Sequence, residues 1–187
     1  MQTMSLDEIL IMQLEGKLNT NNDWNRLCMN YILNEKIIEK YKDKWDKWGW
    51  DYISQYQKLS EEFIEKYINR ISWYYISIYQ KLSEEFIEKH KNKVSWDFIS
   101  QYQKLSEQFI EKHKDRVNWY FISCYQTLSE QFMNKRINDL DWICISRYQK
   151  LSEEFIEKFQ DKVYWPRISK YQILSESFMI KHKDKIN

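Results

Sequence analysis

The sequence predicts an all-α fold, an α-solenoid of short antiparallel helix-hairpin repeats with an N-terminal capping helix. Tryptophan recurs every 23 residues, at Trp50, Trp73, Trp96, Trp119, Trp142 and Trp165. A fixed period of this size is typical of arrays in which neighbouring repeats bury each other's apolar faces. The chain has only two glycines and one proline, which disfavours β folds built from hairpins. Hydrophobic residues make up 43% of the 187 residues, which is enough for a core.

The N-terminal stretch lies outside this period. Ser5 and Glu8 form a capping-box pattern that opens a helix ending near Gly16, and a polar turn is expected at residues 19–23. A degenerate unit then begins at Trp24, with three additional residues around positions 45–49. We therefore expect residues 1–49 to form an N-terminal cap with a degenerate first repeat, and residues 50–187 to form six tandem 23-residue repeats in one continuous domain.

Each repeat contains two helix starts. Ser95 and Ser106 are expected to be N-caps, each flanked by apolar residues in the pattern of a hydrophobic staple. The two helices are predicted at about residues 96–103 and 107–116, and because isolated helices this short are marginal in water, stacking must stabilise them. Pro166 falls in the first turn of its helix, where proline is tolerated. The turn residues expected to adopt left-handed backbone are Asn69, Asn92, Asp115, Asn138, Asp161 and Asp184.

Some polar and aromatic positions do not change from repeat to repeat. The serines are expected to bond back to a carbonyl: Ser54, Ser77, Ser100, Ser123, Ser146 and Ser169. The glutamines favour an inter-repeat amide ladder over a groove that grips a partner: Gln57, Gln80, Gln103, Gln126, Gln149 and Gln172. The tyrosines favour packed core over a stacking platform for bases: Tyr56, Tyr79, Tyr102, Tyr125, Tyr148 and Tyr171.

Charged residues follow the same period. Each second helix has glutamate in its first turn and lysine later, as the helix dipole favours, and Glu62 stands four residues before Lys66 in the order that suits an exposed pair. The segments 89–93, 112–116 and 181–185 are basic and would stack into an edge, interpreted as a solvated surface rather than a nucleic-acid site. The histidines share one position with Tyr67, Arg136 and Phe159, which indicates a packing slot rather than a metal site.

Variation concentrates at three positions of the first helix, and these are the candidate partner-binding residues. They are Asp97, Phe98, Gln101, Tyr74, Tyr75, Ile78, Tyr120, Phe121 and Arg147, with Cys124, Ile143, Cys144, Pro166, Arg167 and Lys170 at equivalent positions. In repeat arrays a fixed scaffold usually carries a variable face, so specificity can be encoded here. Unconstrained drift of a surface is the alternative explanation.

Composition limits the classes of function. Lys and Arg number 29 against 28 Asp and Glu, so the net charge of +1 disfavours nucleic acid and gives no reason to expect a membrane partner. No secretion signal and no run of 18 apolar residues occur. The odd count of three cysteines, without CxxC spacing, favours reduced thiols in an intracellular protein over a disulfide framework. No catalytic, cofactor or metal constellation stands out.

The pattern Trp-x-x-Ile-Ser-x-Tyr-Gln-x-Leu-Ser-Glu-x-Phe-Ile, present at residues 50–64, 73–87 and 96–110, resembles the short tandem repeats of mimivirus-like giant DNA viruses. The likeness covers residues 50–187 and implies a viral protein that acts in the host cytoplasm, without implying any activity. We therefore expect a non-enzymatic scaffold that binds a protein partner. The alternatives are a modular binder of single-stranded nucleic acid and a self-assembling structural protein.

Overall fold

The computed structural model describes residues 1–186, and the regular structure in this range is helical apart from one pair of two-residue strands. The predicted all-α repeat fold is therefore confirmed. The chain divides into two compact units. Unit 1 is Met1–Ser95, and unit 2 is Trp96–Asn187, described up to residue 186.

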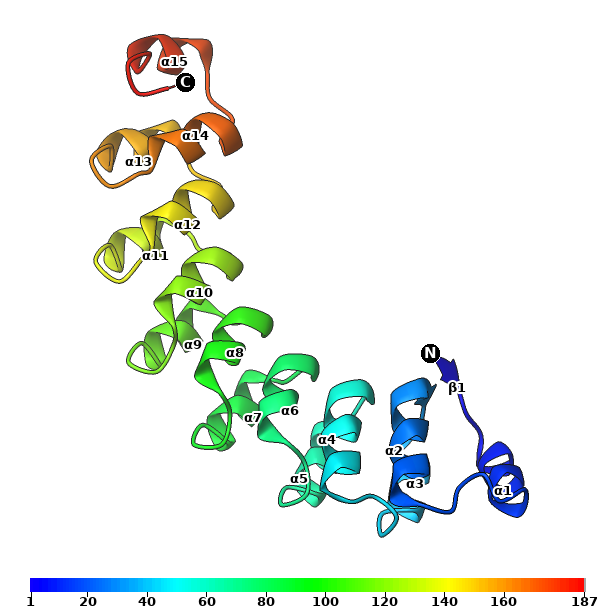
Figure 1. The fold of residues 1–187 in the computed structure, drawn as a ribbon. Helices are drawn as coiled ribbons and strands as arrows, with labels where there is room; N and C mark the ends of the chain where they lie inside the picture. The colour runs from blue at the N-terminus through cyan, green and yellow to red at the C-terminus, as the bar shows by residue number, and fades with distance from the viewer. Residues whose placement is uncertain (187) are drawn as a thin grey trace. The chain divides into compact units, whose positions relative to one another are not determined.

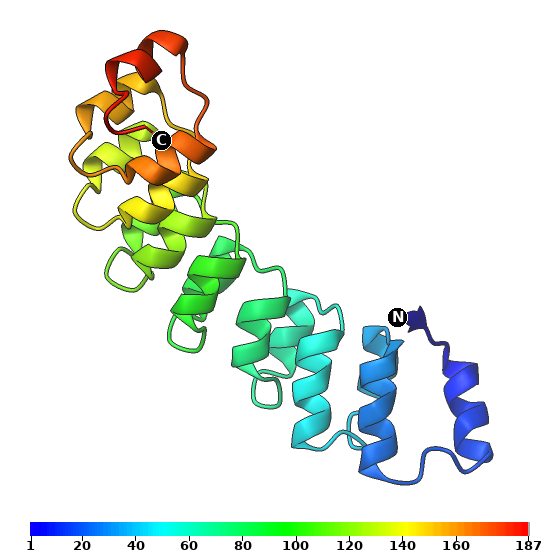
Figure 2. The ribbon, with the colours of Figure 1, turned by 45° about the horizontal axis from the view of Figure 1, so that its top comes forward.

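Unit 1 contains the N-terminal cap and the first repeats. Its helices are α1 (Leu6–Leu14), α2 (Asn21–Asn30), α3 (Glu35–Lys40), α4 (Lys47–Tyr56), α5 (Glu61–Lys66), α6 (Trp73–Tyr79) and α7 (Glu84–Lys89). The helices α2, α4 and α6 pack side by side, and α5 and α7 lie behind them (Figures 1 and 2). The strands β1 (Gln2–Thr3) and β2 (Tyr31–Ile32) pair in parallel and tie the N-terminus to the end of α2. This pairing was not expected from the sequence.

Unit 2 repeats the same hairpin. Its helices are α8 (Trp96–Tyr102), α9 (Glu107–Lys112), α10 (Trp119–Tyr125), α11 (Glu130–Lys135), α12 (Trp142–Tyr148), α13 (Glu153–Lys158), α14 (Trp165–Tyr171) and α15 (Glu176–Lys181). We call α8, α10, α12 and α14 first helices, together with α4 and α6 of unit 1, and the helices that follow them second helices. Within unit 2 the first helices pack in sequence order (Figure 1).

The core of each repeat consists of apolar side chains from both of its helices. In the repeat that begins at Trp96, Ile99 and Ile110 are completely buried, and the Trp96 ring stacks on Phe109 with centroids 6.2 Å apart. Burial of one such side chain contributes about 1.5–3 kcal/mol. Because helices of six or seven residues barely form alone, this packing accounts for their presence.

The helix starts follow the predicted caps in the second helices more closely than in the first. Ser106 and its equivalents accept a hydrogen bond from the N–H three residues later, at 3.1 Å in α9. In the first helices the cap varies: Asn118 and Asp141 cap α10 and α12, whereas Ser72 makes no side-chain cap bond. Pro166 lies in the first turn of α14, as predicted.

The turns after the second helices differ from the prediction. Within the described residues no residue other than glycine has positive φ, so Asn92, Asp115 and their equivalents are not left-handed. Each reversal instead uses a right-handed turn, in which the His113 carbonyl accepts hydrogen bonds from Arg116 N at 2.8 Å and Val117 N at 3.0 Å. The second helices also end earlier than expected, as α9 does at Lys112.

The N-terminal cap begins as predicted. Ser5 and Glu8 form the reciprocal capping box of α1, and the chain leaves this helix through Gly16 at φ 67°. The polar turn expected at residues 19–23 is shorter, because Thr20 caps α2 and residues 21–23 are already helical.

The additional residues near position 45 extend α4 at its start. Asp46 caps this helix by accepting a hydrogen bond from Gly49 N at 2.8 Å. A Cβ at Gly49 would lie 2.6 Å from Asn25 Oδ1. Glycine therefore allows α2 and α4 to approach closely at this point.

Candidate partner-binding face

Within each unit, the recurrent glutamines link a repeat to the one before it, as the ladder interpretation predicted. Gln126 Nε2 donates to the carbonyls of Ser100 at 2.9 Å and Gln103 at 2.7 Å, and its Oε1 accepts from Leu105 N at 3.0 Å. Gln80 makes the same three bonds in unit 1. These bonds satisfy carbonyls at the end of a helix, which have no partner within it. Because Gln126 is only 6% exposed, the alternative of a glutamine-lined groove is wrong.

The recurrent serines belong to the same set of contacts. Ser123 Oγ donates to the Trp119 carbonyl at 2.7 Å and accepts from Asp141 N of the next repeat at 3.0 Å. The predicted back-bond is thus confirmed, and the second bond was not foreseen. Cys28 occupies this position in α2, where burial raises the pKa of its thiol well above the usual value.

Within each unit, the first glutamate of a second helix also contacts the next repeat, as Glu61, Glu107, Glu130 and Glu153 do. Glu130 Oε1 accepts from Ser152 N at 2.6 Å, and its Oε2 accepts from Ser152 Oγ at 3.1 Å. The sequence indicated only a helix-dipole role for it. We call the positions of Gln126, Ser123 and Glu130, with their equivalents in the other repeats, the seam. The polar groups of the seam are occupied in holding repeats together.

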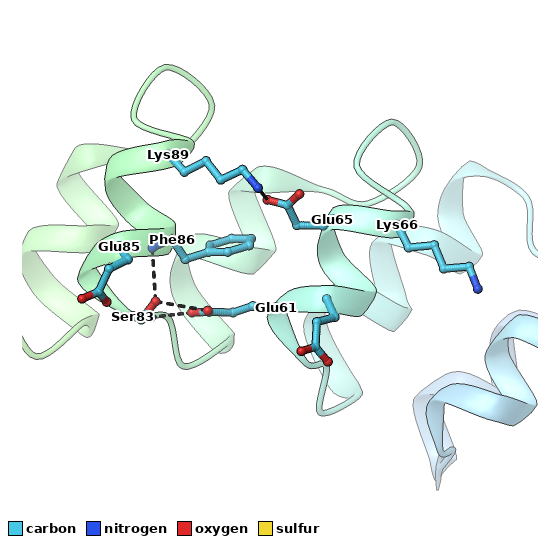
Figure 3. A pocket seen from close by; sticks show the side chains of 8 residues that line it. Glu61, Glu65, Lys66, Ser83, Glu85, Phe86 and Lys89 are labelled. Carbon is cyan, nitrogen blue, oxygen red and sulfur yellow. Dashed lines mark hydrogen bonds and ion pairs between the residues drawn. The ribbon is translucent and has the colours of Figure 1, made fainter.

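The groove between α5 and α7 is part of this seam. It is lined by Glu61, Glu65, Ser83, Phe86 and Lys89, among others. Figure 3 shows Glu61 directed at Ser83 and Glu65 directed at Lys89, with the Phe86 ring between them. Because Glu61, Glu65, Ser83 and Lys89 bond across the two repeats, the groove is a junction between two modules.

The histidine position is a packing slot, as predicted. His90 is 7% exposed, its ring lies 4.9 Å from Trp73 and 4.5 Å from Phe86, and its Nε2 lies 2.6 Å from Glu65 Oε1. Hydrogen bonds from Lys89 and His90 hold the pKa of Glu65 below its usual value. Within residues 1–186 no three His, Cys, Asp or Glu side chains are grouped so that they could hold a metal ion.

The slot and its acidic partner change together. Glu111 pairs with Arg136 at 2.5 Å, and Glu157 pairs with His182 at 2.7 Å. Where the slot holds Phe159, which has no polar atom in its side chain, the position of the acid is occupied by Asn134. In these three pairs, all in unit 2, the two positions are therefore chemically matched.

The expected basic edge contains fewer available groups than the sequence indicates. The histidines are buried, and lysines pair with acids of the preceding repeat: Lys89 with Glu65 at 2.6 Å and Lys181 with Glu157 at 3.0 Å. Lys66 likewise pairs with Glu39, and not with Glu62 as the spacing suggested. Exposed pairs of this kind contribute little to stability, typically less than about 1 kcal/mol.

The recurrent tyrosines are not core residues, so this prediction was wrong. In unit 1, Tyr79 is 52% exposed; in unit 2, Tyr102, Tyr125 and Tyr148 are 52%, 57% and 53% exposed. In α6, α8 and α10 the tyrosine ring lies beside an aromatic side chain four residues earlier, as Tyr102 does beside Phe98 with centroids 6.2 Å apart. Each of these three helices thus carries an exposed tyrosine next to a half-buried ring.

The candidate partner-binding residues lie beside these tyrosines. In unit 1, α6 carries Tyr74, which is exposed, with Tyr75 and Ile78 half-buried. In unit 2, the exposed residues are Asp97 and Tyr120, and the half-buried ones are Phe98, Gln101, Phe121 and Arg147. We call the positions of Asp97, Phe98, Gln101 and Tyr102, with their equivalents, the outer face. The variable residues and the exposed tyrosines therefore share one surface within each unit.

Two cysteines on the outer face are joined. Cys124 of α10 and Cys144 of α12 form a disulfide, with their Cα atoms 4.8 Å apart. The expectation of reduced thiols is wrong for this pair, because spacing within one helix could not reveal that the two positions face each other across successive repeats. Cys28 remains a free, buried thiol.

A cluster of cations lies on the outer face of α12 and α14, and it was not predicted from the sequence. The Arg147 guanidinium carbon lies 4.7 Å from the Tyr148 ring centroid and 5.1 Å from that of Tyr171. Arg167 and Lys170 lie 5.8 Å and 5.5 Å from the Tyr171 ring. The sequence contained one indication of this cluster, because Arg147 and Lys170 occupy equivalent positions of two successive repeats.

Comparison with models of known families, with curated proteins and with solved structures finds no match. In the described part of the chain, no helix has both the length and the apolarity needed to cross a membrane. The candidate partner-binding face is therefore inferred from the geometry of the repeats alone.

Proposed function

We propose that this chain is a non-enzymatic repeat scaffold that binds a protein partner through the outer face. The observation that supports this most is the division of roles within one seven-residue helix. In α10, Ser123 is buried in the seam together with the neighbouring Gln126, whereas Tyr120 and Tyr125 are more than half exposed. Tyrosine is enriched at protein interfaces, where a ring supplies contact area and its hydroxyl supplies a hydrogen bond.

Affinity capture with matched variants tests this proposal. The test variant changes Asp97, Phe98 and Tyr102 to alanine together on the outer face of α8. The control changes the exposed Gln108 and Gln131 of the second helices to alanine. We expect the test variant to lose a partner that the wild-type and control proteins retain. A partner list that is identical for all three proteins would show that the outer face is not the binding surface.

A binder of single-stranded nucleic acid is the second candidate, because half-exposed tyrosine rings at one per repeat suit base stacking. It requires binding to oligonucleotides that weakens steeply with salt. Binding that persists at about 150 mM salt and depends on Tyr102 and Tyr125 would favour it over the scaffold.

Self-association is the third candidate. Ile173 is 94% exposed and Ile180 is 65% exposed, at positions that hold Lys150 and Glu157 one repeat earlier. Apolar residues in such places are typical of contact surfaces. Sedimentation over a concentration series measures it, and a protein that stays monomeric removes this candidate. The viral origin implied by the repeat motif stays a prediction.

A further inference from the structure

We infer that the cation cluster of α12 and α14 is a binding site for an acidic peptide segment of a protein partner. The cation cluster consists of Arg147, Arg167 and Lys170, with the rings of Tyr148 and Tyr171. This inference rests on the proposed scaffold function and names the chemistry of its partner at one place on the outer face.

Among the residues that the structure describes, the three positive charges of the cation cluster have no carboxylate of the protein paired with them. In residues 1–186 no carboxylate forms an ion pair with any of the three, although lysines and arginines elsewhere do so repeatedly. The Nε atom of Arg167 is buried and has no hydrogen-bond partner. A chain with a net charge of +1 thus concentrates three unbalanced positive charges on two neighbouring helices.

Arg147 lies close to two tyrosine rings. Its guanidinium lies near the centroids of Tyr148 and Tyr171, at 4.7 Å and 5.1 Å. A guanidinium over an aromatic ring can still use the N–H groups at its edges for two-point contact with a carboxylate or phosphate. The entropy cost of fixing this side chain on binding is reduced accordingly.

The pKa of the Tyr171 phenol depends on the positive charges around it. Partial burial raises its pKa, but the charges of Arg147, Lys170 and Arg167 outweigh this effect and the pKa lies below the usual value for tyrosine. A bound oxyanion would cancel part of that field. Its binding therefore has a spectroscopic signature at a named residue.

The distribution of charge along unit 2 favours a short acidic peptide over a polyanion. The positions equivalent to Arg147 and Arg167 hold Gln101 and Phe98 in α8, where Asp97 is exposed. A nucleic acid that crosses every repeat would need positive charge in every repeat, and it would meet this carboxylate. A peptide needs one or two acidic groups over α12 and α14, and its apolar side chains can contact the tyrosines next to them.

Fluorescence anisotropy with three labelled probes tests the inference. The probes are an octapeptide with four glutamates and one phenylalanine, the same peptide with glutamine for glutamate, and a thymidine oligonucleotide of equal charge. We expect the acidic peptide alone to bind well, and R147Q/R167Q/K170Q to weaken it by about tenfold. A phosphoserine version of the peptide distinguishes phosphate from carboxylate as the preferred group.

Matched variants make the result decisive. K58Q/K81Q/K104Q removes the same charge from exposed lysines outside the cluster and should leave binding unchanged, and circular dichroism checks that each variant is folded. R147K keeps the charge but loses the stacked plane, so it should weaken binding less than the triple change does. The acidic peptide should also shift the tyrosinate titration of the wild-type protein upward, and Y171F should abolish that shift.

Several results would overturn the inference: no peptide binding, equal loss in the lysine control, or tighter binding of the oligonucleotide through the same three residues. Failure of the peptide with continued loss of a captured partner from the outer-face variant would refute this site and leave the scaffold proposal standing. If the acidic peptide does not bind and the outer-face variant also keeps every captured partner, the scaffold proposal is refuted as well.

Discussion

The seam and the outer face belong to the same short helices but differ in how their residues recur. Ser123 of α10 and Gln126, which follows its last residue, are buried seam residues whose types recur in all six repeats. The outer-face residues Tyr120 and Cys124 are replaced by Asp97 and Gln101 one repeat earlier. A polar side chain recurs here where it satisfies backbone groups of a neighbouring repeat, as Gln126 does. It varies where its contacts with the next repeat are particular to one pair of repeats, as in the Asp97–Asn118 hydrogen bond and the Cys124–Cys144 disulfide.

The largest expected effect lies in the seam. Gln126→Leu removes three hydrogen bonds and leaves the Leu105 N–H and two carbonyls buried without partners. We expect it to lower the free energy of unfolding by about 3–5 kcal/mol. Gln101→Leu, on the outer face of the preceding repeat, should change it by less than about 0.5 kcal/mol. Urea unfolding measures both, and equal losses would contradict the division between the two regions.

The disulfide joins two successive repeats covalently on the outer face. Its cysteines are 20 residues apart, and cross-links over loops of this size typically stabilise by about 2–4 kcal/mol. Reduction should therefore lower the unfolding free energy of the wild-type protein by about that amount. A C124S/C144S variant should be insensitive to the reductant. A wild-type protein that is equally insensitive would refute a stabilising role.

Substitutions in the packing slot test whether the contacts between two repeats are specific to that pair of repeats. F159H places a histidine opposite Asn134, and N134E places a carboxylate opposite Phe159. The double variant recreates the contact seen between His182 and Glu157. We expect the double-mutant cycle to give a favourable coupling of about 1 kcal/mol. Additive effects would mean that the match of the two positions has no energetic basis.

The smallest effect concerns pH. Hydrogen bonds from neighbouring basic side chains lower the pKa of Glu65, Glu111 and Glu157 in the folded protein. The stability that they contribute is therefore present above the unfolded-state pKa of about 4.3 and is lost as the pH falls through the lowered folded-state values. Unfolding of E65Q/E111Q/E157Q should depend less on pH in this acidic range. E62Q/E85Q/E154Q, which changes solvent-facing glutamates, should retain the acid-side loss shown by the wild-type protein.

The repeat, its helices and the serine caps were predictable because they depend on residues close together in the chain. Ser106 caps a helix through an N–H only three residues away, and the ladder role of Gln126 followed from its recurrence. The tyrosines were misassigned because Tyr102 has the spacing of an apolar stripe whether the stripe faces a neighbour or solvent. The hydrogen bond between Glu130 and Ser152 and the disulfide could not be predicted, because they depend on how one repeat is shifted against the next. The repeat period alone does not determine that shift.

The turn after each second helix was misassigned for a different reason. Asparagine and aspartate tolerate left-handed backbone, but the four-residue turn closed by Arg116 N on the His113 carbonyl needs no such residue. The cation cluster was missed because its two rings and three cations come from two repeats and look ordinary in either one alone.

Every bond across the seam in unit 2 joins residues between 18 and 26 positions apart. A pulling force acts on every junction of such a stack, but one junction can break while the others stay intact, because its bonds involve only the two adjoining repeats. Extension should therefore proceed in steps of one module, each refolding against an intact neighbour, so that a unit of this protein would act as a reversible molecular spring.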